Sequence, residues 1–393
     1  MRPRYLRSLP ALGFCLMVLN AGGCSSSSLG GSEFIPDLGN TTDLAEQDGP
    51  VGRLFSSFDY SVAGGQRELA IADLDGNEKP EIIATLPYNG QIAILWNPGT
   101  PQSAISMIST PGTPYGLAVA KLDGDSIPDV AFTDQAAGTL NVFYTKSSIA
   151  DHKDPFTSKQ PVMYALAPGA SVVRAGLLDG DETMDLAVLN TQDGTVSVLT
   201  NLGAAGMFGF KDHKLRVFPG ALHYSMALLA GRVQKAADVV VTNASDDTLN
   251  VLRNSGAGDL ATDVQAQSVI STMRGPVFVT TGGPPDLIDP PVYVAASASN
   301  QIQRWRSAAG RLTLTDIIDV APRPVALAVD KLDTDGTADL VVASSNRDEI
   351  EVLLGTPGGI YMSSPNDRIA TGQAPVAIAI ADLNGDYETQ RAG

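Results

Sequence analysis

The sequence predicts an all-β fold, a β-propeller of about seven four-stranded blades whose last blade is incomplete. Three observations predict it. A short acidic phrase returns about every 50 residues between apolar runs, and such a period indicates an array of like units. The 39 glycines and 25 prolines supply the many turns that short strands need. After residue 50, apolar residues show no sustained helical period.

The first 23 residues have the features of an export signal. Arg2, Arg4 and Arg7 precede an apolar stretch at 9–19 that is too short to span a bilayer as a helix. We therefore expect a signal peptide at 1–23 and an exported protein.

Small residues at 21–23 lead into Cys24, and this arrangement resembles the bacterial lipobox, in which the cysteine is lipidated. The alternative is ordinary signal-peptidase cleavage near the same point. By the lipoprotein resemblance, Ser25 after the cysteine favours anchoring in the outer membrane. The other cysteine, Cys15, lies in the leader, so the mature body has no disulfide and needs its core, with or without bound metal, for stability.

Residues 24–50 are rich in glycine and serine and predict a flexible tether, and residues 51–393 form the predicted propeller. The formal charge is −17, and the body contains no cluster of lysine and arginine. We therefore do not expect the protein to bind nucleic acid.

Each unit is predicted to contain four strands. A small apolar run comes first, at 69–72, 117–120, 326–329 and 377–380. A second apolar run follows the acidic phrase, at 82–84, 130–132, 186–188, 239–241, 292–294 and 340–342, as expected of strands buried on both faces. An alternating third strand comes after a tight turn, at 92–95, 140–143, 196–199, 249–252 and 350–353. The fourth strand is more polar and suits the outer edge of a blade.

The two ends of the propeller region hold fragments of one blade. Residues 54–62 are predicted to be a fourth strand without its first three, and the C-terminus supplies a first strand and half a loop. Either the ring closes imperfectly or the chain is a truncated version of a longer one, and the unusual ending at 387–393 favours truncation.

The acidic phrase has the side chains that a calcium ion requires, since calcium takes six to eight oxygen ligands in irregular geometry. The most complete copy offers four side-chain ligands and one backbone carbonyl, from Asp73, Asp75, Asn77, Glu81 and the carbonyl of Lys79. Four further loops keep part of the set: Asp123, Asp125 and Asp129; Asp179, Asp181 and Asp185; Asp333, Asp335 and Asp339; and Asp382, Asn384 and Asp386.

Two alternatives remain for these loops. Lys121 and Lys331 occupy the first ligand position of their loops, where an ammonium group could replace calcium or could point to solvent. Asp-Gly and Asn-Gly phrases are also ordinary turn formers that need no metal.

These units resemble the FG-GAP/VCBS repeat family, the calcium-loop propellers that also form the head of integrin α-subunits. The resemblance covers residues 51–393. It implies a seven-bladed ring, calcium in the loops, and a role in adhesion or extracellular binding.

No catalytic motif is present. The three histidines, His152, His213 and His223, form no zinc-hydrolase pattern, and no nucleophile elbow or phosphate-binding loop occurs. Aromatic residues are only 6% of the chain, and Trp96 is the best single candidate for stacking on a ligand, against the alternative of a partly buried strand residue.

The sequence therefore predicts a non-enzymatic, calcium-binding adhesion module at the bacterial cell envelope, with an unknown extracellular protein or polysaccharide as ligand. The alternatives are a lyase-like enzyme acting on polysaccharide and a structural subunit of a surface complex.

Overall fold

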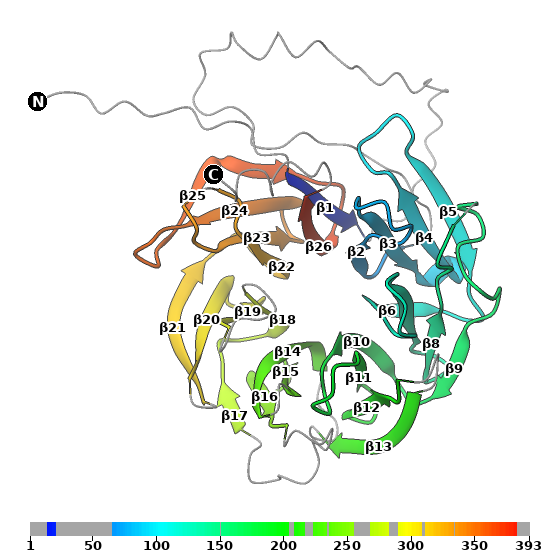
Figure 1. Cartoon of the computed structure of the whole chain (residues 1–393). Helices are drawn as coiled ribbons and strands as arrows, with labels where there is room; N and C mark the ends of the chain where they lie inside the picture. Colours follow the sequence, from blue (N-terminus) through cyan, green and yellow to red (C-terminus); the bar gives the residue numbers. More distant parts are fainter. Residues whose placement is uncertain are drawn as a thin grey trace, which may run out of the picture.

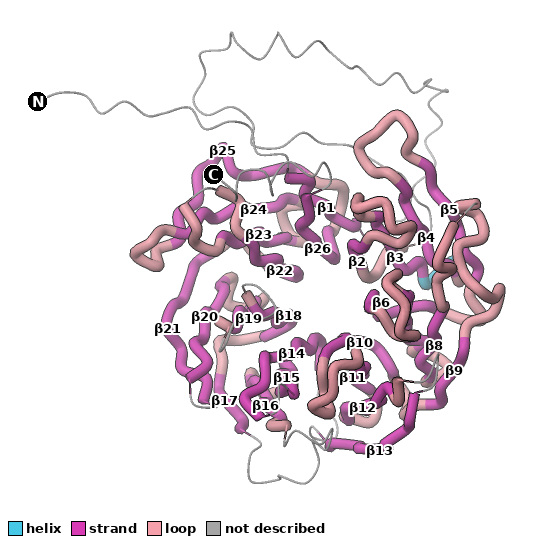
Figure 2. Tube along the Cα trace, viewed as in Figure 1, coloured by secondary structure: helices cyan, strands magenta, loops and turns pink. Residues whose placement is uncertain are grey.

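The computed structural model describes residues 14–20, 65–149, 151–203, 208–216, 223–233, 236–254, 268–282, 290–308, 311–333 and 335–382. These residues form six four-stranded antiparallel sheets and one two-stranded sheet, which stand as blades around a central axis (Figure 1). The described part is almost entirely strand and loop, with one short 3-10 helix, η2 (Pro87–Asn89), between two strands (Figure 2). It contains no helix of the length and apolar character needed to cross a membrane.

The strands follow one another from the axis outward in each blade. The first three blades consist of β2 (Leu69–Ala72), β3 (Glu81–Leu86), β4 (Gln91–Trp96) and β5 (Ala104–Ser109); β6 (Pro114–Ala120), β7 (Asp129–Asp134), β8 (Thr139–Phe143) and β9 (Val162–Ala165); and β10 (Ala170–Gly176), β11 (Asp185–Asn190), β12 (Thr195–Asn201) and β13 (Phe208–Arg216).

The next three blades repeat this order. They consist of β14 (His223–Val233), β15 (Ala236–Asn243), β16 (Thr248–Leu252) and β17 (Ser268–Ser271); β18 (Pro276–Thr281), β19 (Val292–Ala296), β20 (Gln301–Ala308) and β21 (Arg311–Asp319); and β22 (Pro324–Asp330), β23 (Asp339–Ser344), β24 (Glu349–Gly355) and β25 (Tyr361–Ala370).

The core lies between neighbouring blades. The second strands, such as β3, β7 and β11, are buried along their whole length, because both of their faces meet adjacent blades. One apolar cluster joins Leu189 and Val196 of the third blade to Val239 and Val241 of the fourth. By contrast, β5 is mostly exposed, as predicted for the outer edge.

The described residues form six four-stranded blades, so the prediction of about seven was wrong. Within the described residues the last unit contributes its first strand, β26 (Pro375–Asp382), which lies between β22 and β2 and pairs antiparallel with β1 (Phe14–Asn20) from the predicted leader. The described residues of this unit therefore supply one strand to a two-stranded sheet rather than a fourfold set. The fourth strand predicted at 54–62 and the tether at 24–50 lie outside the described residues.

Side chains also join one blade to the next by hydrogen bonds. The hydroxyl of Thr85 donates to the carbonyl of Tyr115 at 2.9 Å, and that of Thr133 donates to the carbonyl of Ser171 at 3.1 Å. In the opposite direction, the side-chain amide of Asn201 donates to Leu122 O at 2.8 Å. These bonds hold inner strands and acidic loops in register around the ring.

Candidate metal centre

The acidic loop of the first blade, residues 73–81, connects β2 to β3 and folds tightly around its own carboxylates. The oxygens of Asp73 accept hydrogen bonds from the backbone N–H groups of Gly76, Asn77 and Glu78 at 2.8, 3.1 and 2.8 Å. Gly76 has φ +74°, a conformation that costs glycine little. The loop therefore bends back on itself and turns its acidic side chains inward.

Glu81 closes this loop from a fully buried position. Its Oε2 accepts a hydrogen bond from Leu74 N at 2.8 Å, while Oε1 is buried and accepts no hydrogen bond of standard geometry among the described residues, although the backbone N–H of Asn97 is near enough to lower the pKa of this carboxyl. Burial, followed by the negative charges of Asp75 and Asp73, raises the pKa of Glu81 to about 7. A buried carboxylate oxygen without a donor is costly unless a cation or a proton neutralises it.

The structure brings three of the five predicted ligands of this loop together. Carboxylate oxygens of Asp73, Asp75 and Glu81 lie within 4.8 Å of one another. The side-chain oxygen of Asn77 lies in the same loop and accepts a hydrogen bond from Lys79 N at 2.8 Å. An all-oxygen set with one buried oxygen that accepts no hydrogen bond of standard geometry in the described structure fits a hard divalent cation such as calcium.

The other loops are arranged differently. In the second, third and sixth blades, the three carboxylates of each loop do not approach one another within that distance in the described part of the chain. Lys121 is exposed, and neither Lys121 nor Lys331 forms an ion pair with a carboxylate of its loop among the described residues. Asn384 and Asp386 of the last loop lie outside the described residues, and Asp382 ends β26.

In these loops the last carboxylate accepts hydrogen bonds from two backbone N–H groups, whereas Glu81 accepts one of standard geometry, from Leu74 N. Asp185 is fully buried and accepts hydrogen bonds from Leu178 N and Asn201 N, each at 2.7 Å. The same two bonds, from the N–H seven residues earlier and the N–H sixteen residues later, are made by Asp129 and by Asp339. This carboxylate therefore ties the acidic loop to the end of the third strand in its own blade.

Asp238 of the fourth blade supports this interpretation. Its unit has lost the rest of the acidic phrase, yet Asp238 still accepts a hydrogen bond from Asn254 N at 2.7 Å and pairs with Arg253 at 2.6 Å. The last carboxylate thus remains where no metal ligand set exists, which sequence reasoning could have noted as a sign of a structural role.

His152 contacts the first loop, and sequence reasoning did not place it there. It comes from the connection between β8 and β9 of the second blade, and its Nε2 lies 3.4 Å from Asp75 Oδ2. Its ring stacks on Trp96, with centroids 4.2 Å apart and an interplanar angle of 4°. The neighbouring blade therefore supports one of the candidate ligands.

Trp96, the candidate for ligand stacking, is fully buried. One face packs on His152, and its indole N–H donates to Ser106 Oγ at 2.9 Å. Trp96 is therefore a core residue behind the acidic loop rather than an exposed platform for a ligand.

The buried carboxylates predict a pH dependence of stability in the absence of metal. Burial raises the pKa of Asp129 to about 7, and those of Asp185 and Asp339 to about 6, above the ordinary value of an aspartate. Between the unfolded and folded pKa values the folded protein binds more protons, so the free energy of unfolding falls as pH rises through 6–7.

Lowering the pH from 8 to 5 in chelator should therefore raise the free energy of unfolding by up to about 5 kcal/mol, since Asp129 contributes over about two pH units and Asp185 and Asp339 over about one each. Urea unfolding followed by tryptophan fluorescence at several pH values measures it. In Asp129→Asn the rise should be smaller, because one of the titrating groups is gone. A free energy that is constant or falls over this range would contradict the prediction.

Comparison with known proteins supports the fold and the repeat. Residues 42–132 match the FG-GAP-like repeat family, which confirms the resemblance for this part of the chain. No curated protein matches the chain.

Solved structures resemble the chain only at low identity, so they support the fold alone. A protein of unknown function from Desulfotomaculum acetoxidans is 12% identical, with a TM-score of 0.56 over 83% of this chain and 92% of that one. A protein from Lactobacillus plantarum is 16% identical, with a TM-score of 0.55 over 81% and 89%. The periplasmic gluconolactonase of Pseudomonas aeruginosa is 11% identical, with a TM-score of 0.55 over 83% and 90%.

Proposed function

We propose that this FG-GAP-repeat propeller is a calcium-binding, non-enzymatic binding module, exported to the bacterial envelope and anchored there through Cys24. Cleavage before Cys24 would remove β1, so the mature chain would lack the pairing of β1 with β26. The observation that carries the metal proposal is the first acidic loop. It gathers Asp73, Asp75 and Glu81 within 4.8 Å and leaves one buried oxygen of Glu81 without a hydrogen bond of standard geometry among the described residues. A divalent cation would supply the missing positive charge.

Calcium in this loop would act on structure rather than on a reaction. The loop connects β2 to β3, and His152 joins it to the second blade. A bound cation would neutralise Glu81 in its buried position and hold the loop of the first blade against its neighbour. The propeller would then present its surface loops as a rigid scaffold for an extracellular protein or polysaccharide.

The substitution Glu81→Gln tests the metal proposal, because the variant should be at least as stable as the parent protein in chelator and less stable than it in calcium. A glutamine keeps the shape and an acceptor for Leu74 N but removes the buried charge. In chelator at pH 8 the variant should therefore be as stable as the parent protein or more stable. Calcium at about 100 times its Kd should stabilise the parent by about 2.7 kcal/mol and leave the variant nearly unchanged.

The matched control is Asp339→Asn, which changes the corresponding position of the sixth blade, where the carboxylate binds backbone N–H groups. This variant should lose stability with and without metal but keep the full calcium response. Thermal melts in calcium and in chelator make the comparison. Equal melting temperatures of the parent protein in the two conditions would rule out the calcium proposal.

The binding role is tested separately from the metal. The purified protein is screened against envelope polysaccharides for retention and for cleavage. Retention without turnover supports the binding module. Depolymerisation would favour the lyase-like enzyme, and the absence of any interaction would favour a structural subunit of a surface complex.

A further inference from the structure

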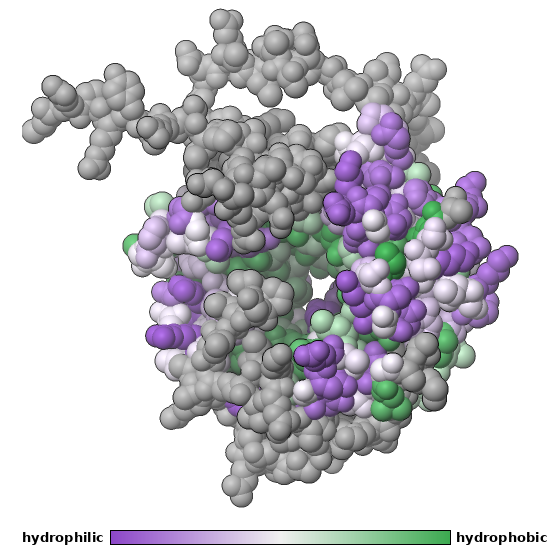
Figure 3. Space-filling model, viewed as in Figure 1, coloured by the Kyte–Doolittle hydropathy of each residue, from purple (hydrophilic) through white to green (hydrophobic). Residues whose placement is uncertain are grey.

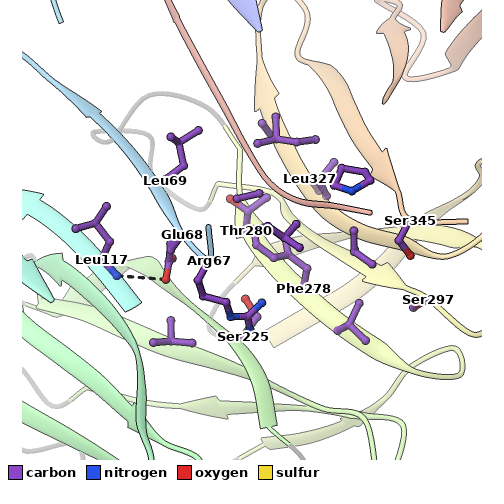
Figure 4. Close-up of a pocket in the computed structure, with 18 of the residues that line it drawn as sticks. Arg67, Glu68, Leu69, Leu117, Ser225, Phe278, Thr280, Ser297, Leu327 and Ser345 are labelled. Atoms are coloured by element: carbon purple, nitrogen blue, oxygen red, sulfur yellow. Dashed lines mark hydrogen bonds between the residues drawn. The ribbon is translucent and has the colours of Figure 1, made fainter. Parts of the chain in front are cut away.

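A cavity of about 660 Å³ lies on the propeller axis, away from the metal loop. It is lined largely by residues at and just before the starts of the inner strands, whereas the acidic loops follow the ends of those strands. Figure 3 shows the molecule hollowed around this axis, and Figure 4 shows the lining side chains. The volume is within the range of sites that bind small molecules.

The lining carries more positive than negative charge. Three arginines, Arg67, Arg174 and Arg323, line the cavity together with two acidic residues, Glu68 and Asp330. The chain as a whole has a formal charge of −17, so the net charge of the cavity lining is opposite in sign to that of the whole protein. Such a reversal favours an anionic ligand.

The arginines are unequally neutralised. Arg174 pairs with Glu68 at 2.7 Å, and Glu68 is held in turn by Leu117 N at 3.3 Å, the contact drawn in Figure 4. The guanidinium of Arg67 lies over the ring of Tyr115, 4.6 Å from its centroid, and forms no ion pair with a described carboxylate. Arg323 likewise forms no ion pair among the described residues and is exposed at the cavity.

Hydroxyl groups and apolar walls complete the lining. Ser225, Ser297 and Thr280 contribute hydroxyls, while Leu69 and Phe278 contribute apolar surface (Figure 4). Guanidinium groups bind carboxylate and phosphate through paired N–H donors, and serine hydroxyls pair with the hydroxyls of a polyol.

We propose that the axial cavity binds a small hydroxylated organic anion, whose acidic group is held by Arg67, while Arg174 and Arg323 add positive charge to the lining. Arg67 is the primary contact, because its charge has no carboxylate partner in the described structure and its ring contact with Tyr115 positions it. Arg174 is shared with Glu68 and contributes less. This site is independent of the metal loop, so it stands whether or not calcium binds.

The test is calorimetric titration of the full purified chain with three probes of similar size: glucuronate, glucose 6-phosphate and uncharged glucose. At least one of the two anions should bind saturably and glucose should not, and the stronger anion tells whether the site takes a carboxylate or a phosphate. Arg67→Gln should weaken binding by about tenfold or more, as loss of a charged hydrogen-bonding contact does. Arg306→Gln, an exposed arginine on β20 outside the cavity, is the matched control and should bind as the parent does.

A second variant, Arg323→Gln, guards against misfolding because its side chain is exposed, and it should also weaken binding. Circular dichroism melts confirm that the variants remain folded. The proposal would be overturned if neither anion bound, if glucose bound as tightly as the anions, or if Arg67→Gln and Arg323→Gln both bound with unchanged affinity. Each titration is repeated in chelator, where the anion affinities should be unchanged because the cavity does not depend on calcium.

Discussion

Replacing Asp185 by alanine should lower the free energy of unfolding by about 3–5 kcal/mol, because two buried backbone donors lose their acceptor. Leu178 N and Asn201 N each donate to this carboxylate at 2.7 Å, and the carboxylate is fully buried. The loop of the third blade would separate from the end of its third strand. Urea unfolding followed by the fluorescence of the two tryptophans measures the change.

The control for this experiment is Asp181→Ala, an exposed carboxylate of the same loop, which should cost less than about 1 kcal/mol. The loss in Asp185→Ala should be equal in calcium and in chelator, because the carboxylate binds backbone rather than metal. A loss seen only in calcium would instead make Asp185 a metal ligand.

Replacing Gly116 by alanine should also destabilise the protein strongly, by about 3 kcal/mol or more. A Cβ at this position would lie 2.2 Å from the carbonyl oxygen of Ser171 in the next blade. Backbone cannot move aside as a flexible side chain can, so the inner strands of the second and third blades would have to separate. That separation would also strain the bond from Thr133 Oγ1 to Ser171 O.

Gly358→Ala is the matched control, since its nearest neighbour would be Thr356 Oγ1 at 3.8 Å. Both variants add one methyl group, and neither glycine has a positive φ, so the difference reports the contact between blades. Thermal melts of the two proteins side by side measure it. Equal melting temperatures would show that the blades can separate at this point without cost.

Much of the blade architecture could be predicted from the sequence. The predicted second strand at 82–84 lies inside β3, and the predicted third strand at 92–95 lies inside β4. Buried strands carry long apolar runs, so their positions are visible in the chain itself. The number of blades could not be predicted in this way, because it was extrapolated from seven loop positions, whereas the described residues of the last unit supply only β26.

The candidate site was predictable where it depends on spacing within one loop, as for Asp73, Asp75 and Glu81. His152 was not, because its contact with Asp75 joins two blades and depends on the path of a long connection. The role of Asp185 was hidden for a similar reason. Its hydrogen-bond donors are backbone N–H groups, which every residue type except proline has. The sequence pattern alone therefore could not show whether this carboxylate binds backbone N–H groups or a cation.

The hydrogen bonds from one blade to the loop of the blade before it bear on how such a ring can change over evolution. Asn254 donates to Leu178 O, and Ala237 N donates to Leu177 O, so the third loop is completed by atoms of the fourth blade. A unit cut out of this chain would therefore take an unfinished loop with it. Gain or loss of units by recombination would preserve the bonding only where the incoming neighbour supplies the same donors, which makes the junction, rather than the blade, the element under selection.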